Sequence, residues 1–178
     1  FRAMSQYLTG DRRFGAVRKT RKEIVFTWTR KEFANLSRAW EAGVPVPEPL
    51  VFDRNILIMQ FLGVGERAYP LLKHAEIPDP GSTYMTVIEV IECLFQKARL
   101  VHGDLSEFNI LMGDHPYLID MGQSVTLDHP QAMQFLVRDI RNINRFFSRL
   151  CPVMEEQELI RRICSRDPGT EGRSWKGR

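Results

Sequence analysis

Three polar residues near the middle of the chain, Asp104, Asn109 and Asp120, constrain its fold more than any other feature. They lie among short apolar runs of the kind that form short strands between turns. These runs are residues 100–101, 109–112 and 117–120, with a Gly-Asp-His-Pro turn between the last two. Asp104 then lies in the loop before the second strand, and Asp120 returns to the same edge of the hairpin. The strands therefore bring both carboxylates and the Asn109 amide together.

This arrangement suits phosphoryl transfer, which needs a carboxylate beside the attacking group and oxygen ligands for divalent cations. Asp104 can accept the proton of a hydroxyl or orient the nucleophile. Asn109 and Asp120 supply hard oxygen ligands of the kind that Mg²⁺ prefers. The spacing matches the kinase pattern His-x-Asp-x-x-x-x-Asn followed by an Asp at a strand end. We interpret His102 as a packing or hydrogen-bonding residue that fixes the loop.

The surrounding sequence predicts a mixed α+β fold. Helix formers dominate residues 29–42, and Gly43 stands where a helix can end. Apolar residues at three-and-four spacing predict three further amphipathic helices, at residues 83–98, 132–147 and 155–164. Ser82 or Thr83 can cap the first of these. An antiparallel hairpin is predicted from two strands around Arg-Asn, at residues 50–53 and 56–61.

Composition and charge narrow the function classes. No apolar run reaches the roughly 18–20 residues of a membrane span, so we expect a cytoplasmic protein with no membrane partner. The three cysteines are odd in number and widely spaced, which fits neither a disulfide framework nor a zinc site. Residues 1–31 hold nine Lys or Arg against two acidic residues. This basic segment is either a solvated surface or a surface for phosphate groups and RNA.

Several segments resemble the RIO family of atypical serine/threonine protein kinases. Residues 100–111, Leu-Val-His-Gly-Asp-Leu-Ser-Glu-Phe-Asn-Ile-Leu, are similar to the family's catalytic loop. Ile-Asp-Met-Gly-Gln-Ser-Val at 119–125 and Asp-His-Pro at 128–130 resemble the RIO1 branch, and we expect its archaeal type. Two upstream segments resemble helix C and the stretch after it, residues 28–36 and 45–49. The resemblance covers roughly residues 15–165.

The resemblance implies a protein-kinase-like, two-lobed α+β fold that binds ATP together with Mg²⁺ or Mn²⁺. Asp104 is then the catalytic aspartate, and Asn109 and Asp120 hold the metal. Asp120 is also the residue proposed in the family to accept phosphate covalently. Glu32 is the helix C glutamate that pairs with the ATP-binding lysine. The nucleotide-binding hinge and the residue beneath the base are Met59, Gln60, Phe61, Leu62 and Leu111. Plain core packing is the other interpretation of the apolar members of this set.

The same resemblance divides the chain into three parts. Residues 1–59 are the end of the kinase N-lobe, residues 60–165 the C-lobe with the catalytic loop and metal site, and residues 166–178 a basic flexible tail. The family's phosphate-covering loop and lysine-bearing strand, which precede helix C, are not visible. Lys19 lies only thirteen residues before Glu32, so we do not assign it the phosphate role. We therefore expect an N-terminally truncated chain that is weakly active or inactive alone.

Three function classes remain open at this stage. The resemblance implies a kinase or ATPase in small ribosomal subunit maturation, which meets the pre-ribosomal particle and ribosomal RNA through residues 1–31. A small-molecule phosphotransferase of the aminoglycoside or choline type shares the His-Gly-Asp-Leu loop. The Gln-Ser-Val and His-Pro pieces argue against that second class. A non-catalytic relic that binds RNA or the ribosome fits the missing lysine. The sequence indicates neither the phosphorylation substrate nor the oligomeric state.

Overall fold

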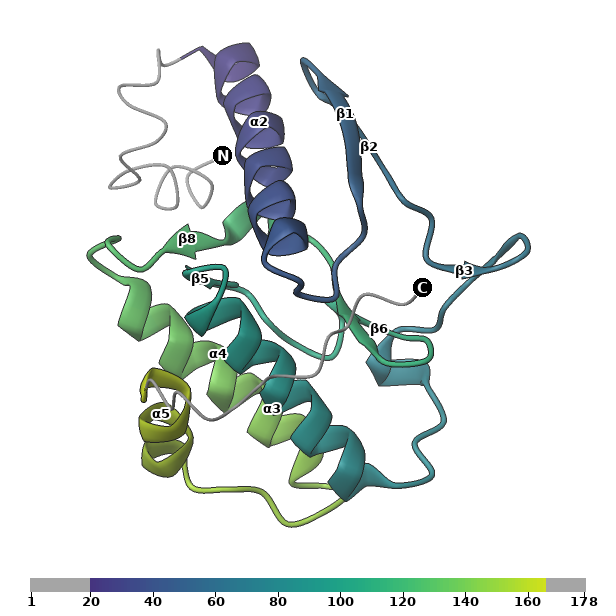
Figure 1. The fold of residues 1–178 in the computed structure, drawn as a ribbon, viewed down its shortest axis with the longest axis vertical. Helices are drawn as coiled ribbons and strands as arrows, with labels where there is room; N and C mark the ends of the chain where they lie inside the picture. Colours follow the sequence, from purple (N-terminus) through teal and green to yellow (C-terminus); the bar gives the residue numbers. More distant parts are fainter. Residues whose placement is uncertain (1–19, 166–178) are drawn as a thin grey trace.

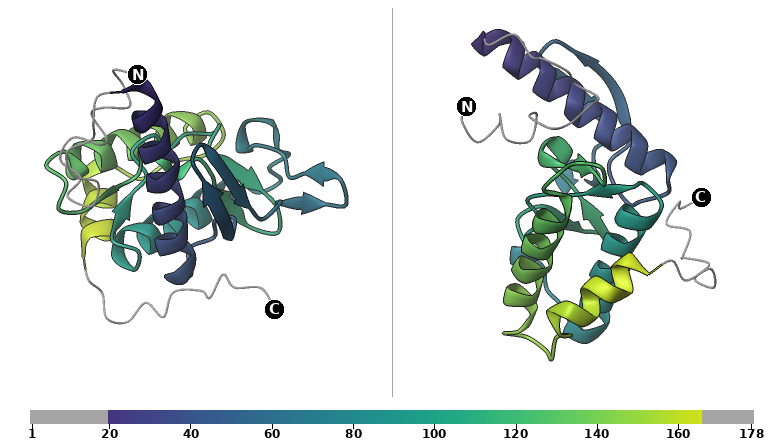
Figure 2. Two further views of the ribbon diagram at one scale, coloured as in Figure 1. Left: turned by 90° about the horizontal axis from the view of Figure 1, so that it is seen from above. Right: turned by 90° about the vertical axis from the view of Figure 1, so that its left-hand side faces the viewer.

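Helix α2 and the β1–β2 hairpin stand above three packed helices, α3, α4 and α5 (Figure 1). The computed structural model describes residues 20–165. The segments 1–19 and 166–178, with Lys19 and most of the basic segment, lie outside the described residues. The described part combines helices with four two-stranded antiparallel sheets, which confirms the α+β class. Figure 2 shows from a second direction that α2 and the hairpin occupy one end of the molecule.

Helix α2 (Arg21–Glu41) begins eight residues before the predicted start at Thr29. The sequence signal for this start is a capping box, Thr-x-x-Glu at residues 20–23. In the structure the Thr20 hydroxyl accepts the N–H of Glu23 at 3.3 Å. β-Branched residues crowd the first turns and lower their helix propensity, which hid this start. The predicted end is confirmed by Gly43, whose φ of 77° is a conformation that glycine adopts without strain.

Strands β1 (Pro49–Asp53) and β2 (Ile56–Met59) form the predicted hairpin, with Arg54 at the turn at φ 52°. The second strand ends at Met59 rather than Phe61. The two strands of the hairpin carry exposed apolar side chains: Leu50, Val51, Ile56 and Ile58. This hairpin is therefore apolar on a surface that faces solvent.

A second, smaller hairpin follows, which the sequence did not predict. It pairs β3 (Gly63–Val64) with β4 (Arg67–Ala68). Gly63 is essential to the pairing, because a Cβ at this position would lie 2.2 Å from the carbonyl oxygen of Arg67. Runs this short leave no alternating pattern to recognise.

Helix α3 (Pro80–Gln96) forms the centre of the lower part. Its N-terminal cap is Asp79, whose carboxylate accepts the N–H of Ser82 at 3.0 Å. The predicted caps, Ser82 and Thr83, lie inside the first turn instead. Pro80 at the first helical position suits this arrangement, since proline lacks the N–H that the helix start leaves unused. The 3-10 turn η1 (Leu72–His74) precedes this helix.

Short strands connect the helices at the centre of the molecule. Strands β6 (Ile110–Met112) and β7 (Pro116–Leu118) form the predicted second hairpin, although β6 starts one residue later and β7 ends two residues earlier than expected. Strand β5 (Leu100–Val101) pairs with β8 (Val125–Thr126), which was not predicted as a strand. Between β7 and β8 lies the 3-10 turn η2 (Met121–Gln123).

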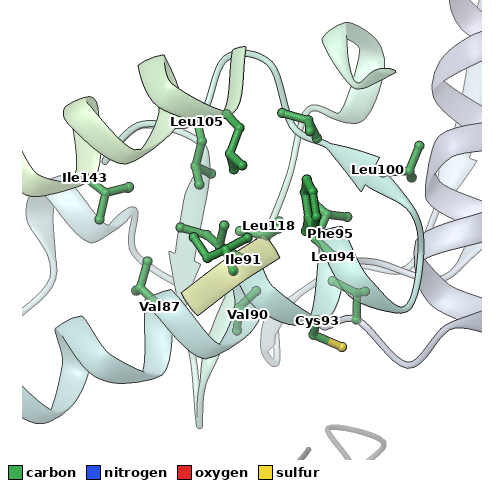
Figure 3. Close-up of a cluster of buried hydrophobic side chains, with 14 of the residues drawn as sticks. Val87, Val90, Ile91, Cys93, Leu94, Phe95, Leu100, Leu105, Leu118 and Ile143 are labelled. Atoms are coloured by element: carbon green, nitrogen blue, oxygen red, sulfur yellow. The ribbon is translucent and has the colours of Figure 1, made fainter. Parts of the chain in front are cut away.

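Helices α4 (Ala132–Phe147) and α5 (Glu156–Cys164) match their predicted bounds within one residue. The side chains of α3 lie between the central strands and α4, where Val87 and Ile91 approach Leu118 and Ile143 (Figure 3). This core positions the loop between β5 and β6. No helix within residues 20–165 is long and apolar enough to cross a membrane.

The cap of α3 gives a direct test of its N-terminus. We expect Asp79→Ala to lower the free energy of unfolding by about 1 kcal/mol, because the first turn loses its side-chain acceptor. Ser82→Ala should change stability far less, since Ser82 contributes its backbone N–H to the cap. Urea denaturation of both variants checks this. Equal losses would contradict the assignment of Asp79 as the cap.

Candidate active site

The predicted catalytic loop, residues 102–109, lies between β5 and β6 and is held by α4. The carboxylate of Asp139 accepts the N–H of Gly103 at 2.8 Å and that of Leu105 at 2.9 Å. Only 1% of the Asp139 surface is exposed. Burial raises the pKa of this carboxyl, although both N–H groups act in the opposite direction. One buried side chain thus fixes the backbone on both sides of Asp104.

Two neighbours of Asp139 on α4 bind carbonyl groups of the same loop. The Arg138 guanidinium donates to the carbonyl of Gly103. The Asn142 amide donates to the carbonyl of Leu105 at 3.0 Å. A buried loop lacks the partners that regular secondary structure supplies, so its polar backbone groups need side chains. Helix α4 supplies them.

His102 joins the loop to the strand end before Asp120. Its ring is buried, and Nε2 lies 3.0 Å from the carbonyl oxygen of Ile119. The N–H of Asp104 points to Nδ1 at 3.4 Å. These contacts agree with an imidazole that donates through Nε2 and accepts at Nδ1. The structure thus uses His102 to fix the loop, as we interpreted it from the sequence.

Asp104, Asn109 and Gln123 form a hydrogen-bonded group. The Gln123 amide donates to Oδ2 of Asp104 at 2.7 Å. The Asn109 amide nitrogen donates to the Asp104 backbone carbonyl, also at 2.7 Å. This leaves Asn109 able to present its amide oxygen to a cation. The carboxylate of Asp104 is held in one orientation and retains Oδ1 for a hydroxyl proton.

Asp120 lies between β7 and η2 with a left-handed backbone, at φ 60° and ψ 62°. Asp tolerates this conformation better than most residues that carry a Cβ. Just before it, the N–H of Ile119 donates to the carbonyl of Asn109 at 3.0 Å. At the far end of the turn, Gln123 reaches Asp104. The backbone on either side of Asp120 is therefore tied to the catalytic loop.

Helix α2 packs on the same turn through two buried polar side chains. The Lys31 ammonium donates to the carbonyls of Gly122 at 2.9 Å and Ser124 at 2.6 Å. The Asn35 amide donates to the carbonyls of Met121 at 2.8 Å and Ser124 at 2.9 Å. Both side chains are completely buried, at 0% exposure. The turn after Asp120 is thus bonded to α2 along its whole length.

The approach of α2 to this turn is very close at Gly122. A Cβ at this position would lie 2.6 Å from Nε1 of Trp28 on α2. The Lys31 ammonium lies 5.6 Å from the centre of the Trp28 ring. Position 122 therefore needs glycine because the helix leaves no room for a side chain.

Glu32, the next residue on α2, is electrostatically coupled to Asp120. Burial and then the Asp120 carboxylate raise the pKa of Glu32 from 4.5 to about 7, and Lys31 opposes them. The two carboxyl groups therefore repel each other when both are ionised. A cation bound nearby would relieve this repulsion and lower the pKa of Glu32.

The oxygen donors present suit a magnesium-type ion. Within residues 20–165, no group of three His, Cys, Asp or Glu side chains could hold a metal. Mg²⁺ does not need such a group, since it commonly binds one or two carboxylates together with phosphate oxygens and water. Asn109 and Asp120 provide an amide and a carboxylate oxygen on neighbouring segments, since the N–H of Ile119 donates to the carbonyl of Asn109 at 3.0 Å.

The predicted hinge follows β2. The N–H of Gln60 donates to the carbonyl of Glu48 at 2.8 Å, and the carbonyl of Leu62 accepts the N–H of Tyr69 at 3.0 Å. The Gln60 carbonyl and the Leu62 N–H are then the backbone atoms that can meet a base.

The apolar residues of the predicted nucleotide site differ in environment. Leu62 is buried, whereas Phe61 is 58% exposed. Met59 and Leu111 are half-buried, and Leu111 forms a β-bridge with Leu71. Plain core packing therefore does not describe Phe61.

The family profile for the RIO domain matches residues 1–159 of the chain. The chain belongs to the RIO family. This finding agrees with the resemblance found in the sequence and favours the first of the three function classes.

Curated relatives of the RIO1 branch extend this comparison. The RIO-type serine/threonine-protein kinase Rio1 of Haloferax volcanii is 45% identical over 84% of this chain, which spans 51% of that protein. Rio1 of Thermoplasma acidophilum is 41% identical, with 84% of this chain and 78% of the relative covered. Human serine/threonine-protein kinase RIO1 is 40% identical over 90% of this chain and 29% of its own length. The chain thus spans about half the length of the Haloferax relative.

A solved RIO structure has the same fold. The Rio2 kinase of Chaetomium thermophilum, solved as an ADP/Mg²⁺-phosphoaspartate complex, matches with a TM-score of 0.64 and 31% sequence identity. The match covers 80% of this chain and 46% of that one. The kinase-like fold predicted for the RIO resemblance is therefore confirmed.

Three residues that shape this RIO site were not assigned a role from the sequence. Gln123 orients Asp104, and Lys31 and Asp139 hold the backbone around the site. Asp139 left a readable signal, since it is a charged residue between Leu136 and Ile140 on the apolar face of α4. Nothing in the sequence indicates the buried position of Lys31, because a lysine on a helix normally lies in solvent.

The Asp139 contacts predict a loss of stability on a small change. Asp139→Asn keeps one acceptor oxygen but places an NH₂ group opposite a buried N–H. We expect the free energy of unfolding to fall by about 1–3 kcal/mol, the cost of one unsatisfied buried donor. Glu158→Gln on the exposed side of α5 makes the same charge change as a control. Equal stability of the two variants in urea denaturation would show that Asp139 does not anchor the loop.

The raised pKa of Glu32 predicts a specific pH dependence in metal-free buffer. Its folded pKa of about 7 exceeds the unfolded value of 4.5, so folding favours the protonated form. The stability from this group is complete below the unfolded value and is lost as pH rises through the folded value. The advantage of wild type over Glu32→Gln should therefore shrink between about pH 5 and 7. Urea denaturation across this range checks it, and a constant difference would contradict it.

Proposed function

We propose that this chain carries the catalytic and metal-binding part of a RIO1-type serine/threonine kinase or ATPase that uses ATP with Mg²⁺ or Mn²⁺. The observation that carries the proposal is the bond from Gln123 to Asp104, which joins the turn after Asp120 to the catalytic loop. The family and the kinase names of its relatives support the same reaction class.

Asp104 acts on the nucleophile in this proposal. Oδ2 is occupied by the Gln123 amide, so Oδ1 is the atom that meets the proton of a hydroxyl or of water. Because the carboxylate cannot rotate away from Gln123 without losing that bond, the acceptor is oriented before reaction. Orientation of this kind is the main contribution a protein makes to phosphoryl transfer.

Asp120 can take the phosphoryl group itself. Its carboxylate oxygen attacks the γ-phosphorus, the bond to the bridging oxygen breaks, and ADP leaves. Water or a hydroxyl then takes the phosphoryl group from the aspartyl phosphate and restores the carboxylate. The phosphoaspartate in the related Rio2 kinase supports this course. When bound, the divalent cation supplies positive charge that stabilises the transferring phosphate, and Asn109 and Asp120 would hold it.

Nucleotide contacts come from the hinge and from Leu111. The Gln60 carbonyl and the Leu62 N–H are suited to the adenine edge, with Met59 and Phe61 beside them. Leu111 lies on β6 two residues after Asn109, where it can pack beneath the base. Glu32 fits the helix C glutamate that pairs with a lysine. Burial and Asp120 raise the pKa of Glu32, so a positive charge nearby would stabilise its ionised form.

The wider assignment follows from this site. We assign residues 1–59 to the N-lobe, 60–165 to the C-lobe and 166–178 to a tail. The phosphate loop and lysine are not assigned to any residue of the chain. For the complete protein we propose a cytoplasmic role in small ribosomal subunit maturation, with the pre-ribosomal particle or its RNA contacting residues 1–31.

Substitution of Asp104 tests the proposed chemistry in the complete protein. We expect Asp104→Ala to lower Mg²⁺-dependent ATP hydrolysis at least about 100-fold, as loss of a general base does. The matched control is Asp53→Ala, on the exposed hairpin far along the chain from the catalytic loop. A radioactive or coupled phosphate-release assay measures both. Unchanged hydrolysis in Asp104→Ala would exclude the catalytic role of this residue.

A further inference from the structure

A groove runs beside the catalytic loop on the side of α4. It consists of two adjoining pockets of about 250 and 260 Å³ that share Phe146 and Arg149. The first is lined by residues 106–108 of the catalytic loop and by Asn142 and Arg145 of α4. The second continues past Lys73 near η1. The groove thus begins two residues beyond Asp104.

The groove carries an excess of positive charge. Lys73, Arg145 and Arg149 are all exposed on its walls, and Glu107 is the acidic residue among its lining side chains. Among residues 20–165, neither Arg145 nor Arg149 has an ion-pair partner. Elsewhere on α4, by contrast, the exposed Arg141 is paired with Glu156 through two hydrogen bonds at 2.6 and 2.9 Å. Two guanidinium groups in the groove are therefore available to an anionic ligand.

The walls of the groove are fixed to the reaction site. Asn142, which lines the first pocket, donates to the carbonyl of Leu105, the residue after Asp104. The N–H of Lys73 donates to the carbonyl of Glu107 at 3.1 Å, which joins the second pocket to the same loop. The groove therefore lies directly against the loop that carries Asp104.

The aromatic side chain in the groove favours a polypeptide over a nucleic acid. Phe108 is 46% exposed, but the Lys73 ammonium lies 4.2 Å from the centre of its ring. The ammonium covers one face of the ring, which leaves a single face for the base stacking by which single-stranded nucleic acids are commonly held. Pockets of about 250 Å³ each accommodate one or two amino-acid side chains.

We propose that this groove binds an acidic polypeptide segment flanking the acceptor hydroxyl, with Arg145 and Arg149 meeting its carboxylates. The proposal rests on the proposed function, since it names the substrate class of the same site. Arginine suits this task because its planar fork donates two parallel hydrogen bonds to a carboxylate.

Fluorescence anisotropy of the complete protein tests the groove without requiring turnover. The probes are a labelled peptide with one serine flanked by glutamates, the same peptide with lysines, and a single-stranded oligouridylate. We expect the acidic peptide to bind best, and the double variant Arg145→Ser/Arg149→Ser to weaken it about fivefold or more, because exposed ion pairs contribute modestly. ATP hydrolysis should stay unchanged.

Two controls separate charge from other effects. Arg145→Lys/Arg149→Lys keeps the charge without the guanidinium fork and should bind better than the serine variant and less well than wild type. Arg161→Ser, which removes an exposed arginine on α5, should not alter binding. Equal binding of both peptides, or no loss in the serine double variant, overturns the proposal. Tighter oligouridylate binding that the double variant abolishes also overturns it, in favour of a nucleic-acid surface. If the wild-type protein prefers the acidic peptide but does not hydrolyse ATP, the result counts against the proposed function alone.

Discussion

The carboxylate of Asp139 is the contact on which the geometry of the site depends. It receives two backbone N–H groups that flank Asp104, and it does so from the middle of a helix packed in the core. Buried polar groups tolerate few alternative arrangements, because each one left without a partner is costly. The catalytic loop has no regular secondary structure, but its hydrogen bonds to α4 therefore hold it in place. This explains how a reactive side chain can be placed accurately on a segment with no regular structure.

On the opposite side of the site, buried side chains of α2 likewise hold the backbone through hydrogen bonds. Lys31 and Asn35 reach backbone carbonyls of the turn after Asp120, so that the helix holds the path of the chain and leaves the aspartate side chain itself accessible. All four of these bonds go to backbone carbonyls. Sequence changes in the turn at positions other than Gly122 could therefore leave the attachment intact, provided the backbone keeps its course. Gln123 then links the two sides through Asp104.

The sequence predicted the parts of this structure whose signals are local. The spacing of Asp104, Asn109 and Asp120 located the loop, and three-and-four periodicity located α3 and α4. It could not locate the side chains that hold the site, because their partners are 19 to 93 residues away. For the same reason the sequence predicted β5 but not its partner β8, because a pair of two-residue strands depends on tertiary packing.

The close contact at Gly122 limits how α2 can move relative to the turn. Inward movement of the helix is blocked, since Trp28 already occupies the space that even a methyl group would need. Outward movement is open and breaks the bonds from Lys31. Displacement of α2 away from the turn would therefore loosen the segment that follows Asp120, and the observed contact is as close as Gly122 and Trp28 allow.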